Sequence, residues 1–520
     1  MTTWPKAVIA LLSGLALVTS CSRADTPSQA NDPADACRSL AIPASVSLSE
    51  PTAWIESADL PRYCRVRGTI AQRIRFEMRL PEEWNGRFLM TGCGGFCGEL
   101  RPDKPGHSNA INEALRRGYA AISHDSGHQA KSWETQWATD PEALQLWAHR
   151  VLPVVSGVGN QLLESLYGKP AHHRYFSGCS NGGRLGLMAA QRYPDLFDGI
   201  AAGASIFDLS GIAGLWGNWL ITQVQEDGVS RFPPAKVPLL SRVVMEQCDA
   251  LDGSADGIIS DPRVCEVDFS AAACGDENPD SESCFRPDEV KLLTRLYGGV
   301  LNDSGDIVYP SAPYGSEPFS DTWLFGTGTQ PAWGALASAG YRRLLATDLG
   351  EPDQPDGLST NRMLEWISRS SVPQLTDAKD PDLSTFRDSQ GKLLIYQGWS
   401  DPLIIPQPIV DYYGQAAQAA GGLDALQAYA RLIMIPGWGH CWEKPAAAAD
   451  DFDPLLAVQR WVEEGVAPDY LIATGTGGQG DAPPSRLLCA WPRTARLIDG
   501  QEPGRYRSYR CVSGDDEAGE

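Results

Sequence analysis

Short apolar runs alternate with longer amphipathic stretches in the first 205 residues of the chain. The runs that predict strands are residues 76–80, 87–90, 120–122, 175–177 and 200–203. The stretches that predict helices are residues 110–117, 144–166 and 183–192. Strands that alternate with helices indicate an α/β fold, in which helices cover both faces of a mostly parallel sheet.

The alternation stops between about Ile206 and Ser384, where the chain is rich in Trp, Pro and Asp, and then it resumes. The later predicted strands are residues 393–396 and 431–435, and the later predicted helices are residues 406–420 and 454–464. Because 520 residues exceed the size at which one core keeps growing, we expect a main domain with a large insertion. The assigned segments are 37–205 and 385–511 for the main domain, 206–384 for the insertion over the sheet, and 512–520 for an acidic tail.

The first 21 residues have the features of an export signal, with Lys6 before an apolar run from Ala7 to Leu17. That run is too short to span a bilayer core of roughly 30 Å. Small residues before Cys21 resemble a bacterial lipobox, in which this cysteine would carry a lipid anchor, and an ordinary signal peptide is the alternative. Residues 22–36 have the composition of a tether, so we expect a periplasmic or outer-membrane lipoprotein, or a secreted protein.

The bulk composition is that of a folded protein, with 42% hydrophobic and 21% charged residues. The formal net charge of -22 argues against nucleic acid or an anionic membrane surface as a partner, because both would repel the chain. Solubility is the simplest explanation of this charge.

Setting Cys21 aside leaves 12 of the 13 cysteines, and an even number in an exported chain predicts disulfide bonds. Closeness along the chain suggests Cys37 with Cys64, Cys93 with Cys97, Cys248 with Cys265, Cys274 with Cys284, and Cys489 with Cys511. Cys179 and Cys441 are left over.

The pattern G-x-S-x-G occurs at residues 178–182, between a predicted strand and a predicted helix. This is the arrangement of the nucleophile elbow in the α/β-hydrolase fold. Glycines are needed there because the turn is strained and the strand packs closely against the helix. Ser180 is therefore the candidate nucleophile of an α/β-hydrolase with a large inserted lid domain.

A serine nucleophile needs a histidine base and a carboxylate to orient it, and this fold supplies them in the order serine, acid, histidine. Of the seven histidines only His440 follows Ser180, and it lies shortly after a predicted strand. Asp401 also follows a predicted strand, whereas its rival Asp411 falls within a predicted helix. The predicted catalytic triad is Ser180, Asp401 and His440.

The two leftover cysteines lie next to this triad. Cys179 directly precedes Ser180, and Cys441 directly follows His440, so a bond between them would hold nucleophile and base side by side. The alternative is that Cys179 is a free buried thiol or the nucleophile itself, although an exported chain would tend to oxidise it.

An oxyanion needs two donors, commonly the backbone N–H after the nucleophile and one from an early glycine-rich loop. Asn181 would supply the first donor, and Gly95 in the loop 92–98 is the candidate for the second, unless that loop is simply a tight turn. His128 precedes the nucleophile, against the chain order of the fold, so we expect it to be loop structure beside the site.

Together these residues resemble the tannase and feruloyl esterase family, over a stretch from about Cys37 to Cys511. The motifs that carry the resemblance are Cys179-Ser180, Asp401, His440-Cys441, Trp84-Asn85-Gly86-Arg87-Phe88, Gly94-Gly95-Phe96, Asp125-Ser126-Gly127-His128, Ser177-Gly178-Cys179-Ser180-Asn181-Gly182-Gly183-Arg184 and Cys248-Asp249-Ala250-Leu251-Asp252-Gly253. The resemblance implies hydrolysis of aromatic carboxylic esters, such as feruloyl or galloyl esters, through an acyl-enzyme. It also implies that the insertion is a lid and that a disulfide joins the neighbours of nucleophile and base.

The resemblance further implies a structural calcium ion in the lid. The matching positions hold the carboxylates of Asp249, Asp252 and Asp256 and the carbonyls of Ser254 and Ile258. Such oxygen ligands suit Ca²⁺, which takes roughly 6 to 8 of them. A solvated turn of Asp and Gly is the alternative.

The family also contains a bacterial hydrolase of mono(2-hydroxyethyl) terephthalate, so a terephthalate monoester hydrolase is an alternative function. That enzyme has an acidic residue after the nucleophile and an aromatic residue at the third position after the triad acid. This chain has Asn181 and Ile404 there, which argues against a terephthalate substrate. Trp323, Phe325 and Trp333 of the insertion could stack on an aryl acyl group or could belong to the core.

Two other functions are compatible with the same scaffold. One is a non-catalytic binding protein on the cell surface, which an intact triad disfavours. The other is a peptidase or acyltransferase that uses the same three residues, which the motifs do not distinguish from an esterase.

Overall fold

The computed structural model describes residues 33–104, 110–226, 229–275, 282–327, 331–441, 443, 449, 451–475 and 484–513. The predicted signal peptide with Cys21, most of the predicted tether and the predicted tail beyond residue 513 lie outside these residues. Among the residues described, no helix is both long and apolar enough to cross a bilayer.

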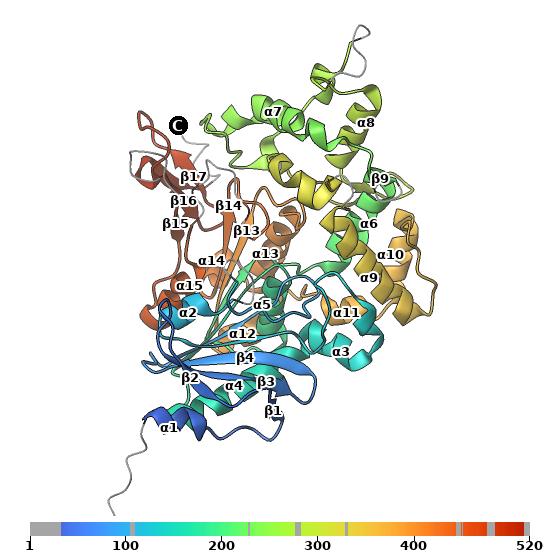
Figure 1. Ribbon diagram of the computed structural model, residues 1–520. Coiled ribbons are helices and arrows are strands. Elements are labelled where there is room, and N and C mark those ends of the chain that lie inside the picture. The colour runs from blue at the N-terminus through green and yellow to red at the C-terminus, as the bar shows by residue number, and fades with distance from the viewer. Residues whose placement is uncertain are drawn as a thin grey trace, which may run out of the picture.

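A sheet of ten strands organises the main domain (Figure 1). In spatial order its strands are β1 (Val46–Leu48), β3 (Tyr63–Ile70), β4 (Ile74–Pro81), β6 (Ala120–His124), β5 (Arg87–Thr91), β7 (His173–Cys179), β8 (Gly199–Gly203), β13 (Lys392–Gly398) and β14 (Ala430–Ile435), with β2 (Ala53–Ile55) paired to β3. All neighbours from β6 to β14 are parallel. The pairs from β1 to β6 are antiparallel. The predicted α/β fold is confirmed, but the sheet is mixed, because the short turn from β3 to β4 permits only antiparallel pairing.

Successive residues of the parallel strands pack on opposite faces of the sheet. On β5, Phe88 and Met90 belong to a core cluster that includes residues of α4 (Val151–Tyr167) and α5 (Asn181–Arg192). Leu89 between them belongs to a second cluster, with residues of α2 (Asn112–Arg116) and α15 (Pro454–Glu464). Both faces are therefore buried under helices, as expected for parallel strands. The other helices of the main domain are α1 (Pro33–Arg38), α3 (Pro141–Gln145), α12 (Ser384–Asp388), α13 (Gln407–Ala419) and α14 (Leu423–Gln427).

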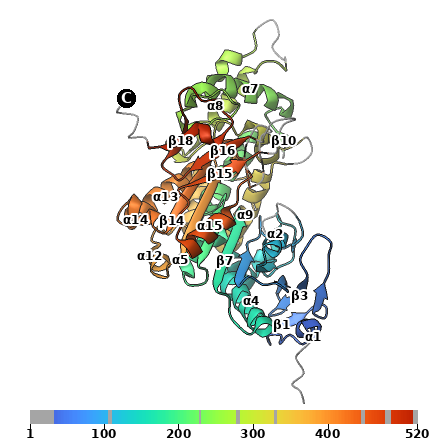
Figure 2. The ribbon, with the colours of Figure 1, turned by 90° about the vertical axis from the view of Figure 1, so that its left-hand side faces the viewer.

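A long insertion separates two strands that are neighbours in the sheet, because β8 ends at Gly203 and its partner β13 begins at Lys392. Its helices are α6 (Gly217–Trp219), α7 (Val237–Cys248), α8 (Pro287–Leu296), α9 (Trp333–Leu349), α10 (Thr360–Arg369) and α11 (Val372–Thr376). Its short strands are β9 (Gln225–Glu226), β10 (Val229–Ser230), β11 (Val300–Leu301) and β12 (Ile307–Tyr309). Figures 1 and 2 both show α7 and α8 at the end of the molecule opposite β1 and β3.

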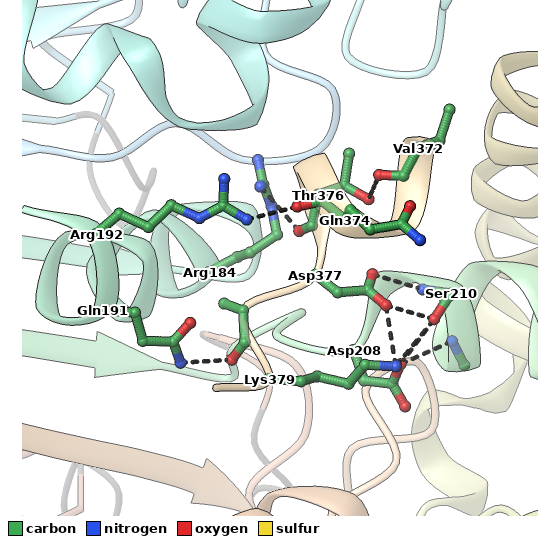
Figure 3. A network of polar contacts seen from close by, with 12 residues as sticks. Arg184, Gln191, Arg192, Asp208, Ser210, Val372, Gln374, Thr376, Asp377 and Lys379 are labelled. Atoms are coloured by element: carbon green, nitrogen blue, oxygen red, sulfur yellow. Dashed lines mark hydrogen bonds and ion pairs between the residues drawn. The ribbon is translucent and has the colours of Figure 1, made fainter. Parts of the chain in front are cut away.

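A polar network fastens both ends of the insertion to the main domain (Figure 3). Asp377, where the insertion returns, accepts hydrogen bonds from the backbone N–H and the hydroxyl of Ser210, where it begins. Lys379 pairs with Asp377 at 3.0 Å. From α5, Gln191 and Arg192 donate to main-chain carbonyls of the returning segment at 2.7 and 2.6 Å. The start and the return of the insertion are therefore held to each other and to the helix that follows the candidate nucleophile.

Two regions differ from the sequence-based expectation. The helix predicted over 144–166 is divided into α3, a π-helical turn at Leu146–Arg150, and α4, because Pro153 has no N–H for the next α-helical bond. The hairpins β15 (Tyr470–Thr474) with β16 (Ser485–Cys489) and β17 (Thr494–Leu497) with β18 (Tyr509–Val512) were not predicted. The first hairpin lies beside β14, because β16 contacts that strand, and the second hairpin contacts β16.

Candidate active site

Ser180 lies at the turn between β7 and α5 in a strained backbone conformation. Its φ of 62° and ψ of -124° are unusual for a residue with a side chain. Its N–H donates to the carbonyl of Gly203 at 2.9 Å, which fixes the turn to β8. A Cβ on Gly178 would lie 2.6 Å from the main chain of Gly182, so the close approach of strand and helix requires glycine. The structure therefore has the nucleophile elbow that the motif predicts.

Asp401 and His440 meet at the ends of the adjacent strands β13 and β14. The distance from His440 Nδ1 to Asp401 Oδ2 is 2.8 Å. The other oxygen of Asp401 accepts from the backbone N–H groups of Leu403 and Ile404 at 3.0 and 2.8 Å, which fixes the carboxylate plane. Asp411 instead lies exposed on α13 and bonds to a neighbouring glutamine, so Asp401 is the acid that orients the imidazole.

A disulfide bond joins Cys179 to Cys441, with 2.07 Å between the sulfurs. It places Ser180 beside His440, whose Nε2 lies 3.7 Å from Cys441 Sγ. Ser180 is 7% exposed, His440 2% and Asp401 0%, so the three side chains are enclosed by protein. The structure thus brings the three predicted triad residues together.

The other disulfide bonds also have the pairing that closeness along the chain suggests. They are Cys37–Cys64, Cys93–Cys97, Cys248–Cys265, Cys274–Cys284 and Cys489–Cys511.

The two expected oxyanion donors lie on elements that are bonded to each other. Asn181 begins α5, and its side-chain amide donates to the carbonyl of Cys93 at 3.1 Å. Cys93 and Cys97 close the glycine loop that carries Gly95, which has a φ of 58°. A Cβ at Gly95 would lie 2.8 Å from the carbonyl oxygen of Ser132, so only glycine fits there without displacement. The oxyanion role of both N–H groups stays a prediction.

Arg184 holds the side chain of Asn181, and although it belongs to a motif of the family resemblance, no role was predicted for it. It is fully buried, and burial lowers its pKa to about 9. Its Nε donates to Asn181 Oδ1 at 2.8 Å, and its other nitrogens donate to the carbonyls of Trp147, Ala148 and Thr376. Its place among the apolar positions of the predicted helix 183–192 was the signal that could have revealed a buried role.

His128 braces the glycine loop and does not meet the triad acid. Its Nε2 donates to the carbonyl of Phe96 at 2.8 Å, and its ring stacks on Trp137 with centroids 3.7 Å apart. Burial lowers its pKa to about 4, so the ring is neutral near pH 7. This is the loop role expected from the sequence.

A tryptophan of the insertion lies against His440, and two further tryptophans extend from it. Trp323, in the π-helical turn η10 (Asp321–Phe325), contacts His440 edge to face, with ring centroids 4.9 Å apart. Trp333 packs on Trp323 at 5.2 Å and is 38% exposed, and Trp133 packs on Trp333 at 5.1 Å. Phe325 instead packs on Phe232 within the insertion. An aromatic wall made of Trp323, Trp333 and Trp133 therefore runs from His440 towards solvent.

The acidic loop after α7 contains oxygen ligands of the kind that a calcium site needs, but most of them already accept hydrogen bonds or pair with an arginine. Asp249 accepts from the N–H groups of Gly257 and Ile258, and Asp252 accepts from those of Ser254 and Ser260. Asp256 pairs with Arg486 at 2.6 Å, while its other oxygen is buried without a hydrogen bond.

Burial raises the pKa of Asp256, and the charges of Asp252 and Asp249 raise it further. These mutually repelling carboxylates and the orphaned oxygen suit a cation. Among the residues described, however, no three His, Cys, Asp or Glu side chains stand close enough to hold a metal in this conformation. Calcium binding by Asp249, Asp252, Asp256, Ser254 and Ile258 stays a prediction.

Taken together, the strained serine turn, the buried histidine–aspartate pair and the sheet define an α/β-hydrolase. The family model for tannase and feruloyl esterase matches residues 59–512. The chain is 30% identical over 545 aligned residues to the mono(2-hydroxyethyl) terephthalate hydrolase of Piscinibacter sakaiensis, covering 91% of this chain and 89% of that protein. It is 28% identical over 472 residues to feruloyl esterase B of Aspergillus niger, covering 86% of each.

The fold leads to the same family. The crystal structure of feruloyl esterase B from Aspergillus oryzae superposes with a TM-score of 0.80 at 25% identity, covering 92% of this chain and all of that one. The chain therefore belongs to the tannase and feruloyl esterase family and is a carboxylic ester hydrolase, which confirms the resemblance seen in the motifs.

Proposed function

We propose that this protein hydrolyses esters of aromatic carboxylic acids through an acyl-enzyme on Ser180. The observation that carries the proposal is the disulfide that holds a strained serine beside a histidine whose Nδ1 is bonded to a buried carboxylate. Nucleophilic catalysis by serine needs this relation of nucleophile, base and orienting acid.

In the first half of the reaction, Ser180 Oγ attacks the ester carbonyl carbon while His440 Nε2 takes the hydroxyl proton. Asp401 stabilises the imidazolium through the Nδ1–H bond and keeps the ring in the required tautomer. The N–H groups of Asn181 and Gly95 receive the oxyanion. His440 then gives its proton to the departing alkoxide, and the alcohol leaves.

The second half uses the same groups on water. His440 takes a proton from the water as the hydroxide adds to the acyl carbon, and the imidazolium then gives that proton to Ser180 Oγ as the intermediate collapses and the acid leaves. Enclosure of the triad strengthens each of these electrostatic contacts, because bulk water is kept away from them.

The aromatic wall is an argument for substrates whose acyl group carries an aromatic ring. Trp323 is 2% exposed and serves as backing, whereas Trp333 presents 38% of its surface and offers a ring for stacking. The name of the feruloyl esterase relative agrees with a hydroxycinnamoyl ester. A galloyl or related hydroxybenzoyl ester has the same aryl acyl chemistry.

A terephthalate monoester is the second candidate substrate, supported by the 30% identity to the Piscinibacter enzyme. The side chain of Asn181 is bonded to the glycine loop, and Ile404 is 1% exposed beside the triad acid. Neither residue presents a charge to a terephthalate carboxylate, so we place this substrate second.

The proposal also includes a structural calcium ion and export of the protein from the cytoplasm. Ca²⁺ would brace the acidic loop through Asp249, Asp252 and Asp256 without taking part in the chemistry. Six disulfide bonds support export to an oxidising compartment. A lipid anchor on Cys21 would hold the protein at a membrane, and mass spectrometry of the mature N-terminus tests it.

The test of the function combines labelling with a substrate screen. A fluorophosphonate probe should modify Ser180 in the wild-type protein and not in Ser180→Ala, and the purified protein should hydrolyse feruloyl, galloyl or chlorogenate esters faster than terephthalate monoesters. Full ester hydrolysis by Ser180→Ala would reject the nucleophile. An absence of labelling would favour the non-catalytic binding protein, and faster terephthalate release would reverse the order of the two substrates.

A further inference from the structure

One carboxylate beside the active site has no part in the mechanism above. Glu443 follows His440 by three residues and is half-buried. Its Oε2 accepts a hydrogen bond from Trp323 Nε1 at 2.6 Å and another from the backbone N–H of His440 at 3.2 Å. A single oxygen therefore links the insertion to the loop that carries the catalytic base.

The main chain of Glu443 is fixed in the same loop. Its carbonyl accepts from the N–H of Gly439 at 2.9 Å, and its own N–H donates to the carbonyl of His440 at 3.3 Å. A Cβ on Gly439 would lie 2.8 Å from the ring of Phe319, so the insertion packs directly on this loop. The side chain of Glu443 therefore projects from a closed loop towards the indole of Trp323.

The indole that Glu443 holds is the one that packs against the imidazole. The rings of Trp323 and His440 meet at 76°, and Trp323 is backed by Trp333 at 89°. An imidazole that rotated away from Asp401 would have to displace this buried ring, because close-packed side chains leave no free volume.

We propose that Glu443 is a positioning residue, which holds Trp323 edge-on against His440 and so keeps the imidazole in the rotamer that bonds to Asp401. The inference rests on the proposed function, because it assumes that His440 is the base. Position, and not charge, is what Glu443 supplies: an oxygen acceptor at this place is sufficient.

The electrostatic surroundings agree with an acceptor role. The titratable groups that face the Glu443 carboxyl are His440 and Asp401, which act on its pKa in opposite directions: His440 lowers it and Asp401 raises it. Burial raises the pKa of Glu443, which weakens the preference for the ionised form. A carbonyl oxygen is available for the Trp323 N–H in either protonation state.

The test compares Glu443→Ala, Glu443→Gln, Trp323→Phe and the double variant Glu443→Ala/Trp323→Phe on a p-nitrophenyl ester and on the best aryl ester. We expect kcat of Glu443→Ala to fall about tenfold or more with KM little changed, because a misplaced base slows the chemical step. Glu443→Gln should stay within about threefold of the wild type, since its amide oxygen still accepts. Trp323→Phe should lose kcat, and the double variant should be no slower than Trp323→Phe alone.

Matched controls are Glu464→Ala, on the exposed face of α15, and Trp84→Phe, whose N–H bonds to the carbonyl of Arg87 in the main domain. Both should leave kcat unchanged, and thermal melting should show that each variant is folded. If Glu443→Ala does not fold, Glu443→Gln and Trp323→Phe decide the question.

Three results would overturn the inference alone, in a wild-type enzyme that is active and labelled by a fluorophosphonate. They are an unchanged kcat in Glu443→Ala, a Glu443→Gln as slow as Glu443→Ala, or additive losses in the double variant. A wild-type protein that is neither active nor labelled would overturn the proposed function, and the inference with it.

Discussion

The side-chain amide of Asn181 donates to the main-chain carbonyl of Cys93 and lies 3.2 Å from Cys97 Sγ. The residue after the nucleophile is therefore bonded to the loop that carries Gly95. Arg184 holds the other end of the same amide group. The relative position of the two proposed oxyanion donors thus depends on one asparagine side chain as well as on the backbone.

Asn181→Ala retains the backbone N–H but removes this bond. We expect kcat to fall about tenfold with little change in KM, because the second oxyanion donor loses its alignment. Steady-state kinetics on a p-nitrophenyl ester measures the effect. Asn160→Ala is the matched control, since the Asn160 amide donates to the carbonyl of Ser156 within α4, and it should leave kcat unchanged. A wild-type kcat in Asn181→Ala would show that the loop is aligned without this bond.

The disulfide beside the triad should act on both stability and rate. It closes a loop of 262 residues, so the chain-entropy model assigns it on the order of 5 kcal/mol. The double variant Cys179→Ala/Cys441→Ala should therefore unfold at lower denaturant and also lose kcat, because the nucleophile and base are no longer joined.

The matched control is Cys489→Ala/Cys511→Ala, which opens a bond of separation 22 between the C-terminal hairpins. The same model assigns this bond roughly 3 kcal/mol, so it should lower stability while leaving kcat intact. Equal effects of the two double variants on kcat would contradict a role for the first bond in the reaction.

Glu317 should make the stability depend on pH. Its carboxyl is fully buried in the insertion, accepts a hydrogen bond from the Tyr297 hydroxyl at 2.6 Å, and has a pKa raised by burial to about 7. Because this folded-state pKa exceeds the usual value of 4.5, the contribution is fully present below about pH 4.5 and is lost as pH rises through 7. The loss is on the order of 3 kcal/mol.

Glu317→Gln should remove this dependence, because the neutral amide has no proton to lose. Denaturant unfolding at a series of pH values measures it, and the variant should gain stability relative to the wild type above pH 7. Glu56→Gln, at a side chain that is 82% exposed, is the control and should leave the profile unchanged. Parallel profiles for the wild type and Glu317→Gln would refute the assignment.

Calcium should stabilise the fold of the insertion without changing the rate of ester hydrolysis. A ligand at 100 times its Kd adds about 2.7 kcal/mol, so chelation by EDTA should lower the Tm and added Ca²⁺ should restore it. Asp252→Asn should abolish this response, whereas Asp303→Asn, at an exposed turn, should preserve it. Initial rates at low temperature should change little in either variant. A Tm that is unchanged by EDTA and by added Ca²⁺ would exclude the proposed calcium site.

Most of the main domain follows from local pattern in the sequence. The helix predicted over 454–464 has these bounds in α15, because Asp453 caps its first turn, Pro454 opens it and Gly465 ends it in a left-handed conformation. The order of the strands was not predicted. The predicted strands 76–80 and 87–90 became β4 and β5, which are separated in the sheet by β6, since pairing over such distances is decided by packing and not by local propensity.

Chain order and the remaining cysteines both select Ser180 and His440, whereas Asp401 was predicted from chain order and from its place after a predicted strand. Trp323 is a candidate for aryl stacking from the sequence, but its contact with Glu443 could not be predicted, because 120 residues separate the two. Their contact exists only once the insertion has folded onto the loop after β14. For the acidic loop, the sequence is enough to recognise residue types that suit a calcium ion. It is not enough to establish that an ion binds there.

The disulfide between Cys179 and Cys441 also constrains the order of maturation. The other five bonds join cysteines 4 to 27 residues apart, so each can close soon after its segment emerges into an oxidising compartment. Cys179 must wait until the whole insertion and β14 have followed it, and during that time it is exposed to exchange with the intervening cysteines. Secretion of active enzyme is therefore expected to depend on disulfide isomerisation, because the bond beside Ser180 cannot close before Cys441 has emerged.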